Sequence, residues 1–245
     1  MLLVLLALVA PAFSVRAQND DDKNNEFRLT LFPYHRLTDQ LTGFGYLGYV
    51  NSPQNDYQTY YVGYGGSYAF NSSVQLWAGL ISTYTDNQNS ANKLELRPFI
   101  GPKVFVPNPW KWNIYNWTRY EFRGIQNQDT HNWAEVNRIR SRFGVEFPLT
   151  SLGKAWTLKT WYGMADVEPF YRFDREEIDP FRVRGGIGYI VNKRFRVEFI
   201  YTGQWTRANG TAPLKYTDNI FRLNIKIALD KGILGRVFDG GDAGD

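Results

Sequence analysis

Residues 194–205 read RFRVEFIYTGQW, and apolar or aromatic side chains alternate with polar ones along most of this stretch. One parity carries Phe195, Val197, Phe199, Tyr201, Gly203 and Trp205, and the other carries Arg194, Arg196, Glu198, Ile200, Thr202 and Gln204. Successive side chains of a β-strand point to opposite faces, so the stretch predicts a strand with one apolar and one charged face. Such strands of about ten residues are typical of a transmembrane β-barrel, whereas strands of soluble sandwiches have about five or six.

The same alternation recurs eleven times between Phe27 and Leu229. It predicts strands at residues 27–36, 42–50, 57–70, 73–85, 92–105, 112–123, 133–147, 155–166, 181–191, 194–205 and 217–229. Short turns at one end and longer polar loops at the other are expected to join them as hairpins. Bacterial single-chain barrels have an even number of strands, so we expect an all-β, antiparallel, up-and-down barrel of twelve strands, with ten as second choice. The segment 163–173 is the candidate for an extra strand or a bulge.

Composition agrees with a barrel of this kind. Aromatic residues make up 17% of the 245 residues, which suits strands and interfacial girdles. The mean hydropathy is −0.42, and outside the extreme N-terminus no run of eighteen apolar residues occurs, which excludes a helical membrane protein. The chain has no Cys, so disulfides and thiolate metal sites are excluded.

The chain divides into four segments. Residues 1–17 have the short apolar core and the small residue, Ala17, of a secretory signal peptide, although no Lys or Arg precedes the core. The alternative for this segment is a buried N-terminal strand or helix. An acidic leader follows at 18–26, then the barrel at 27–229, then a tail at 230–245 that is either a short periplasmic helix, a plug or disordered. We therefore expect export to the outer membrane of a Gram-negative bacterium.

The apolar parity is expected to face lipid. It includes Val74, Leu76, Ala78, Leu80, Leu94, Leu96, Ile100, Val183, Ile187, Tyr189, Val191, Phe221, Leu223, Ile225 and Ile227. None of these is Lys or Arg, which would cost about 2–4 kcal/mol at the bilayer midplane.

The opposite parity is expected to face the lumen, and it is strongly basic. Its cations are Lys93, Arg97, Lys103, Arg119, Arg123, Arg138, Arg140, Arg142, Lys159, Arg182, Arg184, Arg194, Arg196, Arg222 and Lys226, against the carboxylates Glu95, Glu121, Glu146 and Glu198. In one interpretation, ladders of Arg and Glu fill a narrow structural barrel. In the other, the excess positive charge attracts an anionic small solute or an acidic oligosaccharide into a narrow, porin-like, anion-selective pore.

Three stretches resemble a bacterial family of outer-membrane β-barrels of unknown function (domain of unknown function 2490). They are the Arg-rich run 137–149 (NRIRSRFGVEFPL), residues 165–171 (ADVEPFY) and residues 182–189 (RVRGGIGY). The resemblance spans roughly residues 27–229 and implies a barrel in the outer membrane, and the family supplies no agreed activity or catalytic residues. A weaker likeness is to small monomeric porins for acidic oligosaccharides, which also line the bore with Arg.

Catalytic motifs are sparse. A lipid hydrolase needs a Ser nucleophile, a His base and an orienting acid, yet His35 and His131 are the only histidines and neither has a Ser in a recognisable setting. Glu168, before Pro169, is either a general acid or a salt-bridge partner, and we favour the salt bridge. We find no catalytic residue, metal ligand or cofactor motif, and no exposed basic patch for nucleic acid.

The sequence therefore predicts a non-enzymatic outer-membrane barrel, structural or a narrow passive pore, with outer-membrane lipid as its partner and a monomer favoured. The alternatives are an outer-membrane lipid-modifying enzyme of the acyl-hydrolase type and a soluble, lipocalin-like binding barrel.

Overall fold

The structure is a computed structural model that describes residues 23–110, 112–150, 156, 158–208 and 212–229. Eleven β-strands form it within these residues: β1 (Asn24–Arg36), β2 (Leu41–Ser52), β3 (Tyr57–Ala69), β4 (Val74–Asn87), β5 (Lys93–Val106), β6 (Asn113–Asn127), β7 (Trp133–Pro148), β8 (Trp161–Arg172), β9 (Glu177–Ile190), β10 (Phe195–Thr206) and β11 (Lys215–Ala228). A single 3-10 turn, η2 (Pro53–Asn55), lies between β2 and β3. No described segment is an α-helix long and apolar enough to span a membrane. The expected signal peptide and tail fall outside the described residues.

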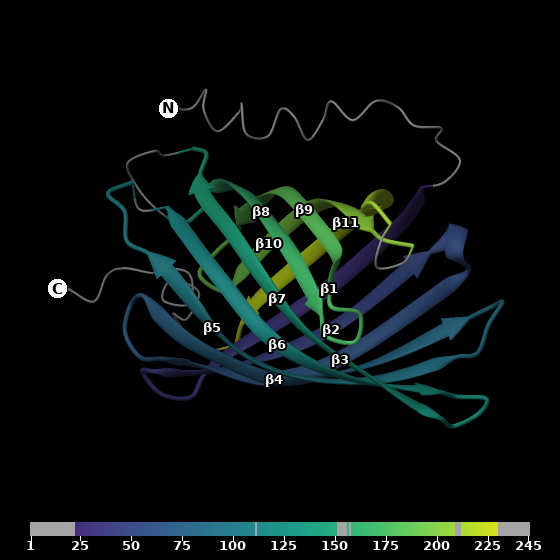
Figure 1. Cartoon of the computed structure of the whole chain (residues 1–245). Helices are drawn as coiled ribbons and strands as arrows, with labels where there is room; N and C mark the ends of the chain where they lie inside the picture. The colour runs from purple at the N-terminus through teal and green to yellow at the C-terminus, as the bar shows by residue number, and fades with distance from the viewer. Residues whose placement is uncertain (1–22, 111, 151–155, 157, 209–211, 230–245) are drawn as a thin grey trace.

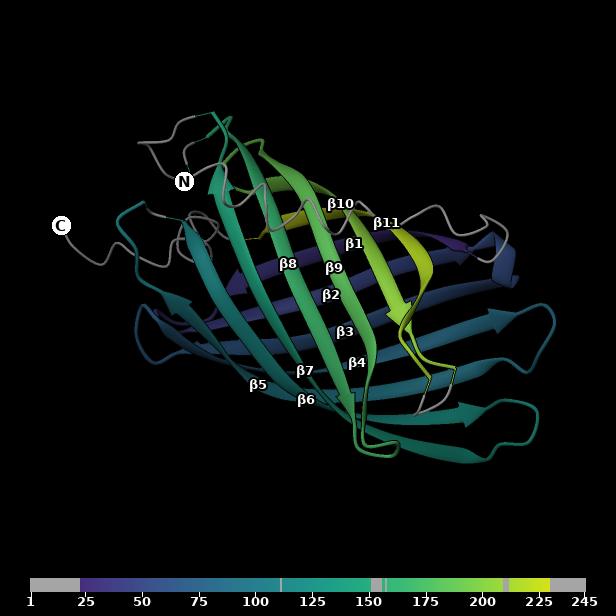
Figure 2. The ribbon, with the colours of Figure 1, turned by 45° about the horizontal axis from the view of Figure 1, so that its top comes forward.

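The strands close into one barrel in sequence order (Figures 1 and 2). Each neighbouring pair from β1 to β11 is antiparallel, and β1 pairs with β11 in parallel, with Leu29 opposite Leu223. An up-and-down chain with an odd number of strands leaves its first and last strands pointing the same way, so only a parallel pair can close it. The prediction of an all-β barrel is confirmed. The eleven described strands are close to the expected count of about twelve, and the barrel is mixed rather than purely antiparallel.

Most strands lie within a few residues of their predicted bounds, and the largest shift is at β8. This strand spans Trp161–Arg172 instead of 155–166, and β9 starts at Glu177 instead of 181. The pairing of β8 with β9 slips between Pro169 and Tyr171, so the segment 163–173 holds a bulge and not an extra strand. Pro169 has no backbone N–H for the ladder, which is a common reason for such an irregularity.

The connections define two ends of the barrel. End 1 carries residues 37–40, 70–73, 107–112, 149–160 and 191–194, and end 2 carries residues 53–56, 88–92, 128–132, 173–176 and 207–214. The expected contrast between short turns and long loops is wrong, because the longest connection, 149–160, lies at end 1. At end 2, β4 and β6 extend to Asn87 and Asn127, so residues expected in loops belong to strands.

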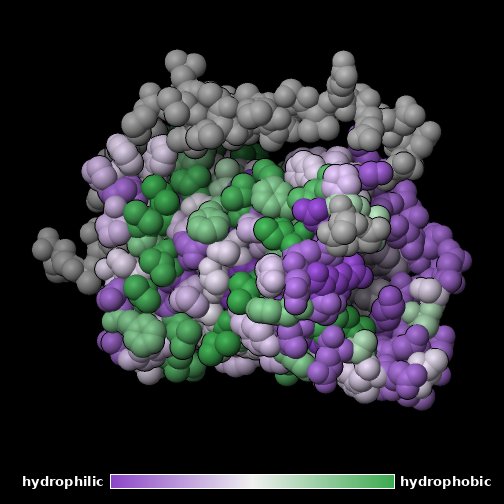
Figure 3. All heavy atoms as spheres, in the orientation of Figure 1, coloured by the Kyte–Doolittle hydropathy of each residue, from purple (hydrophilic) through white to green (hydrophobic). Residues whose placement is uncertain are grey.

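The two strand faces differ as the alternation predicts. Large apolar side chains of the outward parity are exposed, among them Leu80, Ile100, Ile187, Phe199 and Leu223. Figure 3 shows apolar side chains spread over much of one face, with hydrophilic ones gathered at the right, where the β4–β5 and β6–β7 hairpins turn. The inward parity is largely buried and charged.

An aromatic cluster fills part of the barrel interior towards end 1. Its buried members are Tyr34, Phe44, Trp77, Ile81, Phe99 and Ala228, with Phe32, Tyr46, Tyr61 and Trp117 packed against them. Phe44 and Trp77 stack with ring centroids 4.7 Å apart. Apolar side chains thus pack in the half near end 1, where Lys103, Glu198 and Lys226 also lie, and charged side chains line the middle of the barrel and the half near end 2.

Candidate functional site

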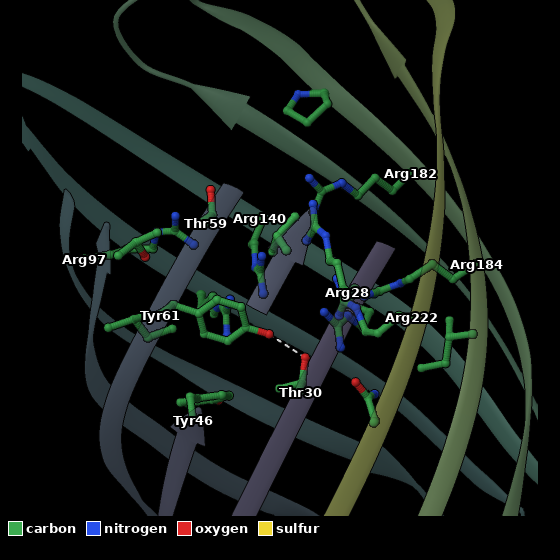
Figure 4. A pocket seen from close by; sticks show the side chains of 18 of the residues that line it. Arg28, Thr30, Tyr46, Thr59, Tyr61, Arg97, Arg140, Arg182, Arg184 and Arg222 are labelled. Atoms are coloured by element: carbon green, nitrogen blue, oxygen red, sulfur yellow. Dashed lines mark hydrogen bonds between the residues drawn. The ribbon is translucent and has the colours of Figure 1, made fainter. Parts of the chain in front are cut away.

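A cavity of about 770 Å³ lies inside the barrel and touches all eleven strands (Figure 4). Its wall carries the cations Arg28, Lys93, Arg97, Lys103, Arg119, Arg123, Arg138, Arg140, Arg142, Arg182, Arg184, Arg222 and Lys226, and the carboxylates Glu26, Glu95, Glu146, Asp166, Asp179 and Glu198. Two further carboxylates, Glu121 and Glu168, lie on the same face and are 0% and 1% exposed. Cations therefore outnumber carboxylates even when these two are counted.

Glu121 of β6 holds three guanidinium groups. Its carboxylate lies 2.6 Å from Arg119, 2.6 Å from Arg138 and 3.2 Å from Arg140. The register places Glu121 directly opposite Arg138 of β7, which brings the two side chains together on the inward face. A buried charge is stable only when it is paired and hydrogen-bonded, so this group fixes the β6–β7 wall.

Glu168 of β8 extends the same network around the barrel. Its carboxylate lies 3.4 Å from Arg140, 3.1 Å from Arg142 and 3.3 Å from Arg184. Arg184 also pairs with Asp166 at 2.6 Å. Because Arg140 contacts both Glu121 and Glu168, the ion pairs run without a break from β6 to β9. The preferred interpretation of Glu168 as a salt-bridge partner agrees with these contacts.

Two smaller groups line the remaining wall near end 2. Glu95 accepts a two-pronged contact from Arg123, at 2.7 and 2.8 Å, and pairs with Arg97 at 2.6 Å. Glu26 pairs with Arg28 and accepts a hydrogen bond of 2.6 Å from the Tyr57 hydroxyl. These carboxylates neutralise part of the basic wall.

Several cations of the cavity wall also lie over aromatic rings. The guanidinium carbons of Arg138, Arg140 and Arg182 lie 4.9, 5.3 and 4.8 Å from the centroid of Phe170. Towards end 1, the Lys103 ammonium lies 4.5 Å from the Tyr115 ring and 4.8 Å from the Phe105 ring. Such contacts stabilise a cation without neutralising its charge.

The two ends of the cavity differ in packing. Towards end 1 the inward side chains Phe44, Tyr162, Ile190 and Ala228 are at most 2% exposed. Glu198 is held there by Lys226, by Tyr162 at 2.8 Å and by Asn224 at 3.0 Å. Towards end 2 the wall includes the half-buried Asn87, Arg123, Gln204 and Thr206. The residues around the cavity therefore include fully buried aromatic and aliphatic side chains towards end 1 and half-buried polar side chains towards end 2.

The structure brings most of the sequence-predicted lumen residues to this one cavity. Arg97, Arg119, Arg123, Arg138, Arg140, Arg142, Arg182, Arg184, Arg222, Lys226, Glu95, Glu146 and Glu198 line it, Glu121 lies behind it, and Arg196 is 2% exposed on the same face. Arg194 differs, because it is exposed in the 191–194 turn. The Asn192 side chain accepts hydrogen bonds from the backbone N–H groups of Arg194 and Phe195, so β10 begins only at Phe195. Lys159 is likewise exposed, before β8 begins.

Sequence reasoning left Glu26, Arg28 and Asp166 out of the lumen residues and named Glu168 as a salt-bridge partner without placing it on a strand. The signal for the first two was present, because Glu26, Arg28 and Thr30 alternate with Phe27, Leu29 and Leu31. The acidic leader was expected to run to residue 26, whereas β1 already begins at Asn24. Asp166 was the last residue of the expected strand, and Glu168 fell beyond that strand because β8 extends to Arg172, six residues past the expected end.

Other titratable groups lie away from the cavity centre. At end 2, hydrogen bonds from Arg172, the shortest 2.6 Å, lower the pKa of Asp174 in the 173–176 connection. His35 lies on the outward face near end 1, 2.9 Å from the Tyr64 hydroxyl, and His131 is in the 128–132 connection at end 2. Within the described residues no group of three His, Cys, Asp or Glu side chains is arranged to hold a metal ion.

Fold and site together define a closed β-barrel with its charged side chains inside and its apolar side chains outside. The chain belongs to the family described as "Protein of unknown function (DUF2490)", whose model matches residues 12–214. This is the family that the three sequence stretches resemble, so that expectation is confirmed. The match ends just before β11. None of the curated proteins compared with the chain matches it.

Proposed function

We propose that the protein is a non-enzymatic outer-membrane β-barrel whose internal cavity attracts anions from end 2. The observation that carries the proposal is the excess of cations on the cavity wall. Guanidinium and ammonium groups around a cavity with low-dielectric walls concentrate anions and repel cations.

The outer surface supports a membrane environment. The strands are 12–16 residues long, long enough to cross a bilayer at a tilt. Exposed aromatic side chains occur towards both ends, for example Tyr68 and Trp161 at end 1 and Tyr84 and Trp133 at end 2. Aromatic girdles at both interfaces are typical of membrane barrels.

The polarity of the two faces argues against a soluble binding barrel. A lipocalin-like protein needs a polar exterior, whereas large exposed apolar patches on a soluble monomer favour association. Here the charged residues on the outward parity of the described strands are Asp86 and Glu135, both within three residues of a strand end. The middle of that face carries apolar side chains and a few uncharged polar ones, such as Thr118 and Ser141. The interior of this barrel is charged.

Nothing in the geometry favours the lipid-hydrolase alternative. His35 and His131 lie at opposite ends of the barrel, and His35 is engaged with Tyr64 on the outward face. The two histidines cannot serve one catalytic site.

Packing of the aromatic cluster towards end 1 leads to a specific expectation for conductance. The intact protein in planar bilayers should pass little current, and the double variant Phe44→Ala, Trp77→Ala should open an anion-selective path, because it removes two stacked rings from the packed half. Reversal potentials in a KCl gradient measure the selectivity. The matched control Phe199→Ala removes an exposed outward ring and should leave the conductance low.

Heat-modifiable gel migration of each variant establishes that the barrel is folded before conductance is compared. Large, non-selective conductance of the unaltered protein, or cation selectivity of the opened variant, would contradict the proposal. Recovery of the protein in the soluble fraction without detergent would contradict the membrane location.

A further inference from the structure

Four guanidinium groups meet where β1 and β11 close the barrel. Figure 4 shows Arg28 from β1, Arg182 and Arg184 from β9 and Arg222 from β11 pointing toward one another inside the cavity. The Glu121 group adjoins these arginines, because Arg138, Arg140 and Arg182 all contact the ring of Phe170.

The register of the closing strand pair places two of these arginines side by side. Arg28 and Arg222 are direct partners across the parallel β1–β11 pair. Like charges directly opposite each other on neighbouring strands are destabilising, so the arrangement costs stability in the absence of a counter-charge. An arrangement that destabilises the protein without a ligand indicates that its function is to bind one.

The local charges leave two cations uncompensated. Arg28 is paired with Glu26, and Arg184 with Asp166 and Glu168. Arg182 donates a hydrogen bond of 2.6 Å to the neutral Gln204 and has no carboxylate within ion-pair distance among the described residues. Arg222 likewise has no such carboxylate, and its buried Nε atom has no hydrogen-bond partner.

Hydroxyl groups complete the surroundings. Thr30 and Tyr61 are hydrogen-bonded to each other beside these arginines (Figure 4). A bond between two hydroxyls uses one of their two hydrogens, which leaves the other available as a donor. The cavity wall therefore offers guanidinium forks and a hydroxyl donor around one point.

We propose that Arg28, Arg182, Arg184 and Arg222 form a binding site for a tetrahedral dianion, such as a phosphate monoester or the inorganic sulfate ion. Two uncompensated cations are matched by two negative charges. The tetrahedral oxygens accept the several N–H donors that the guanidinium forks present, as phosphate groups do at Arg clusters. The inference rests on the proposed anion-attracting cavity and specifies where in it, and for which class of anion, binding is strongest.

Calorimetric titration of the full chain in non-ionic detergent tests the site, with inorganic phosphate and sulfate as dianion probes and acetate as the monoanion, at constant ionic strength. We expect phosphate and sulfate to bind at least about tenfold more tightly than acetate. Arg222→Gln should weaken phosphate binding about tenfold or more, since it removes a charged hydrogen-bond donor. The exposed Arg194→Gln, with the same charge change, should leave binding unaltered.

A second cavity variant distinguishes a localised binding site from a general electrostatic attraction of anions to the cavity. Arg97 lies on β5 and is paired with Glu95, so Arg97→Gln should weaken phosphate binding by less than about threefold through loss of one distant charge. Equal weakening by Arg97→Gln and Arg222→Gln overturns the site and leaves the general attraction of anions intact. Absence of dianion binding together with absence of anion preference in the opened barrel overturns both proposals.

Thermal unfolding gives an independent readout. Without dianions, Arg222→Gln should unfold at a higher temperature than the unaltered protein, because it relieves the repulsion from Arg28. Phosphate should raise the unfolding temperature of the unaltered protein and not that of the variant. A variant that is less stable and responds equally to phosphate overturns the site.

Two phosphate monoesters, one soluble and one carried on a lipid, show which kind of molecule supplies the dianion. Glycerol 3-phosphate presents a soluble phosphate monoester, and phosphatidic acid in mixed micelles presents it on a lipid. Arg222-dependent binding of either supports the site and assigns its source, whereas binding of neither overturns it.

Discussion

At the scale of single residues, the ion pairs inside this barrel depend on a set of carboxylates that is smaller than the set of cations around the cavity. Glu121 is 0% exposed and contacts Arg119, Arg138 and Arg140. Removing one partner of a buried ion pair costs much more than the pair contributes, because the remaining charge stays buried. The carboxylates should therefore be the most sensitive positions of the wall.

Glu121→Gln keeps the shape of the side chain and removes its charge. We expect it to lower the free energy of unfolding by about 3–5 kcal/mol, measured by urea titration in detergent or lipid vesicles. The matched control Asp39→Asn breaks the exposed pair with Arg36 and should cost less than about 1 kcal/mol. Equal, small effects of the two variants would show that the Glu121 network contributes little.

Residue placement was predictable wherever the alternation was unbroken. The parity of residues 137–142 and 194–204 placed Arg138, Arg140, Arg142 and Glu198 on the inward face. Parity does not show where a strand starts, so Arg194 was assigned to a strand and Glu26 to the acidic leader. Arg28 lay inside the expected strand 27–36 and was not assigned to the lumen. Which carboxylate holds which guanidinium depends on register between strands, and a single sequence does not contain that information.

At the scale of elements, the β5–β6 pair has an especially close backbone approach. A Cβ atom on Gly101 would lie 2.0 Å from the Thr118 carbonyl oxygen and 2.5 Å from the Arg119 Cα. Glycine is required here because any side chain would push the two strands apart beside Arg119.

Gly101→Ala should consequently destabilise the barrel by about 1–3 kcal/mol, measured by urea unfolding. Gly185→Ala is the control, because nothing lies within 4 Å of its Cβ position on β9. That variant should be neutral or stabilise the protein by up to about 1 kcal/mol through the less flexible unfolded chain. A neutral Gly101→Ala would mean that β5 and β6 are not in this register.

The strands themselves were largely predictable, and their odd number was not. Eleven alternating segments were visible, yet the even-number rule favoured twelve, because a parallel closing pair has no local sequence signature. The position of β8 was missed for a related reason. Its alternation runs through Pro169, and only pairing with β9 shows that the ladder continues past that proline to Arg172.

The parallel closure can be tested by crosslinking. The chain has no Cys, so a double variant Leu29→Cys, Leu223→Cys holds the only two thiols. The two residues are direct partners on neighbouring strands, within the range that a disulfide spans, and should crosslink on oxidation, shown by faster gel migration of the unfolded chain. Leu29→Cys with Ile227→Cys, about 13 Å apart along the strands, should not. Crosslinking of the 29/227 pair without crosslinking of the 29/223 pair would show that β1 and β11 are paired in another register or direction.

At the scale of the whole molecule, the account depends on one division: apolar side chains outside, charged side chains inside. The barrel has no separate apolar core in the half near end 2, where ion pairs fill the wall, and it has an aromatic cluster towards end 1. An apolar exterior of this kind favours an apolar medium over water. The proposed membrane location and the proposed anion attraction therefore both rest on the same alternation.

Spin labels along β10 test that division most directly, on single-Cys variants of the chain in lipid vesicles. Labels at Val197, Phe199 and Tyr201 should be accessible to oxygen dissolved in the bilayer, and labels at Ile200 and Thr202, at most 7% exposed inside the barrel, should be shielded from it. Heat-modifiable migration establishes that each labelled barrel is folded. Oxygen access at Ile200 and Thr202, or access of a water-soluble nickel chelate at Val197, Phe199 and Tyr201, would contradict the account.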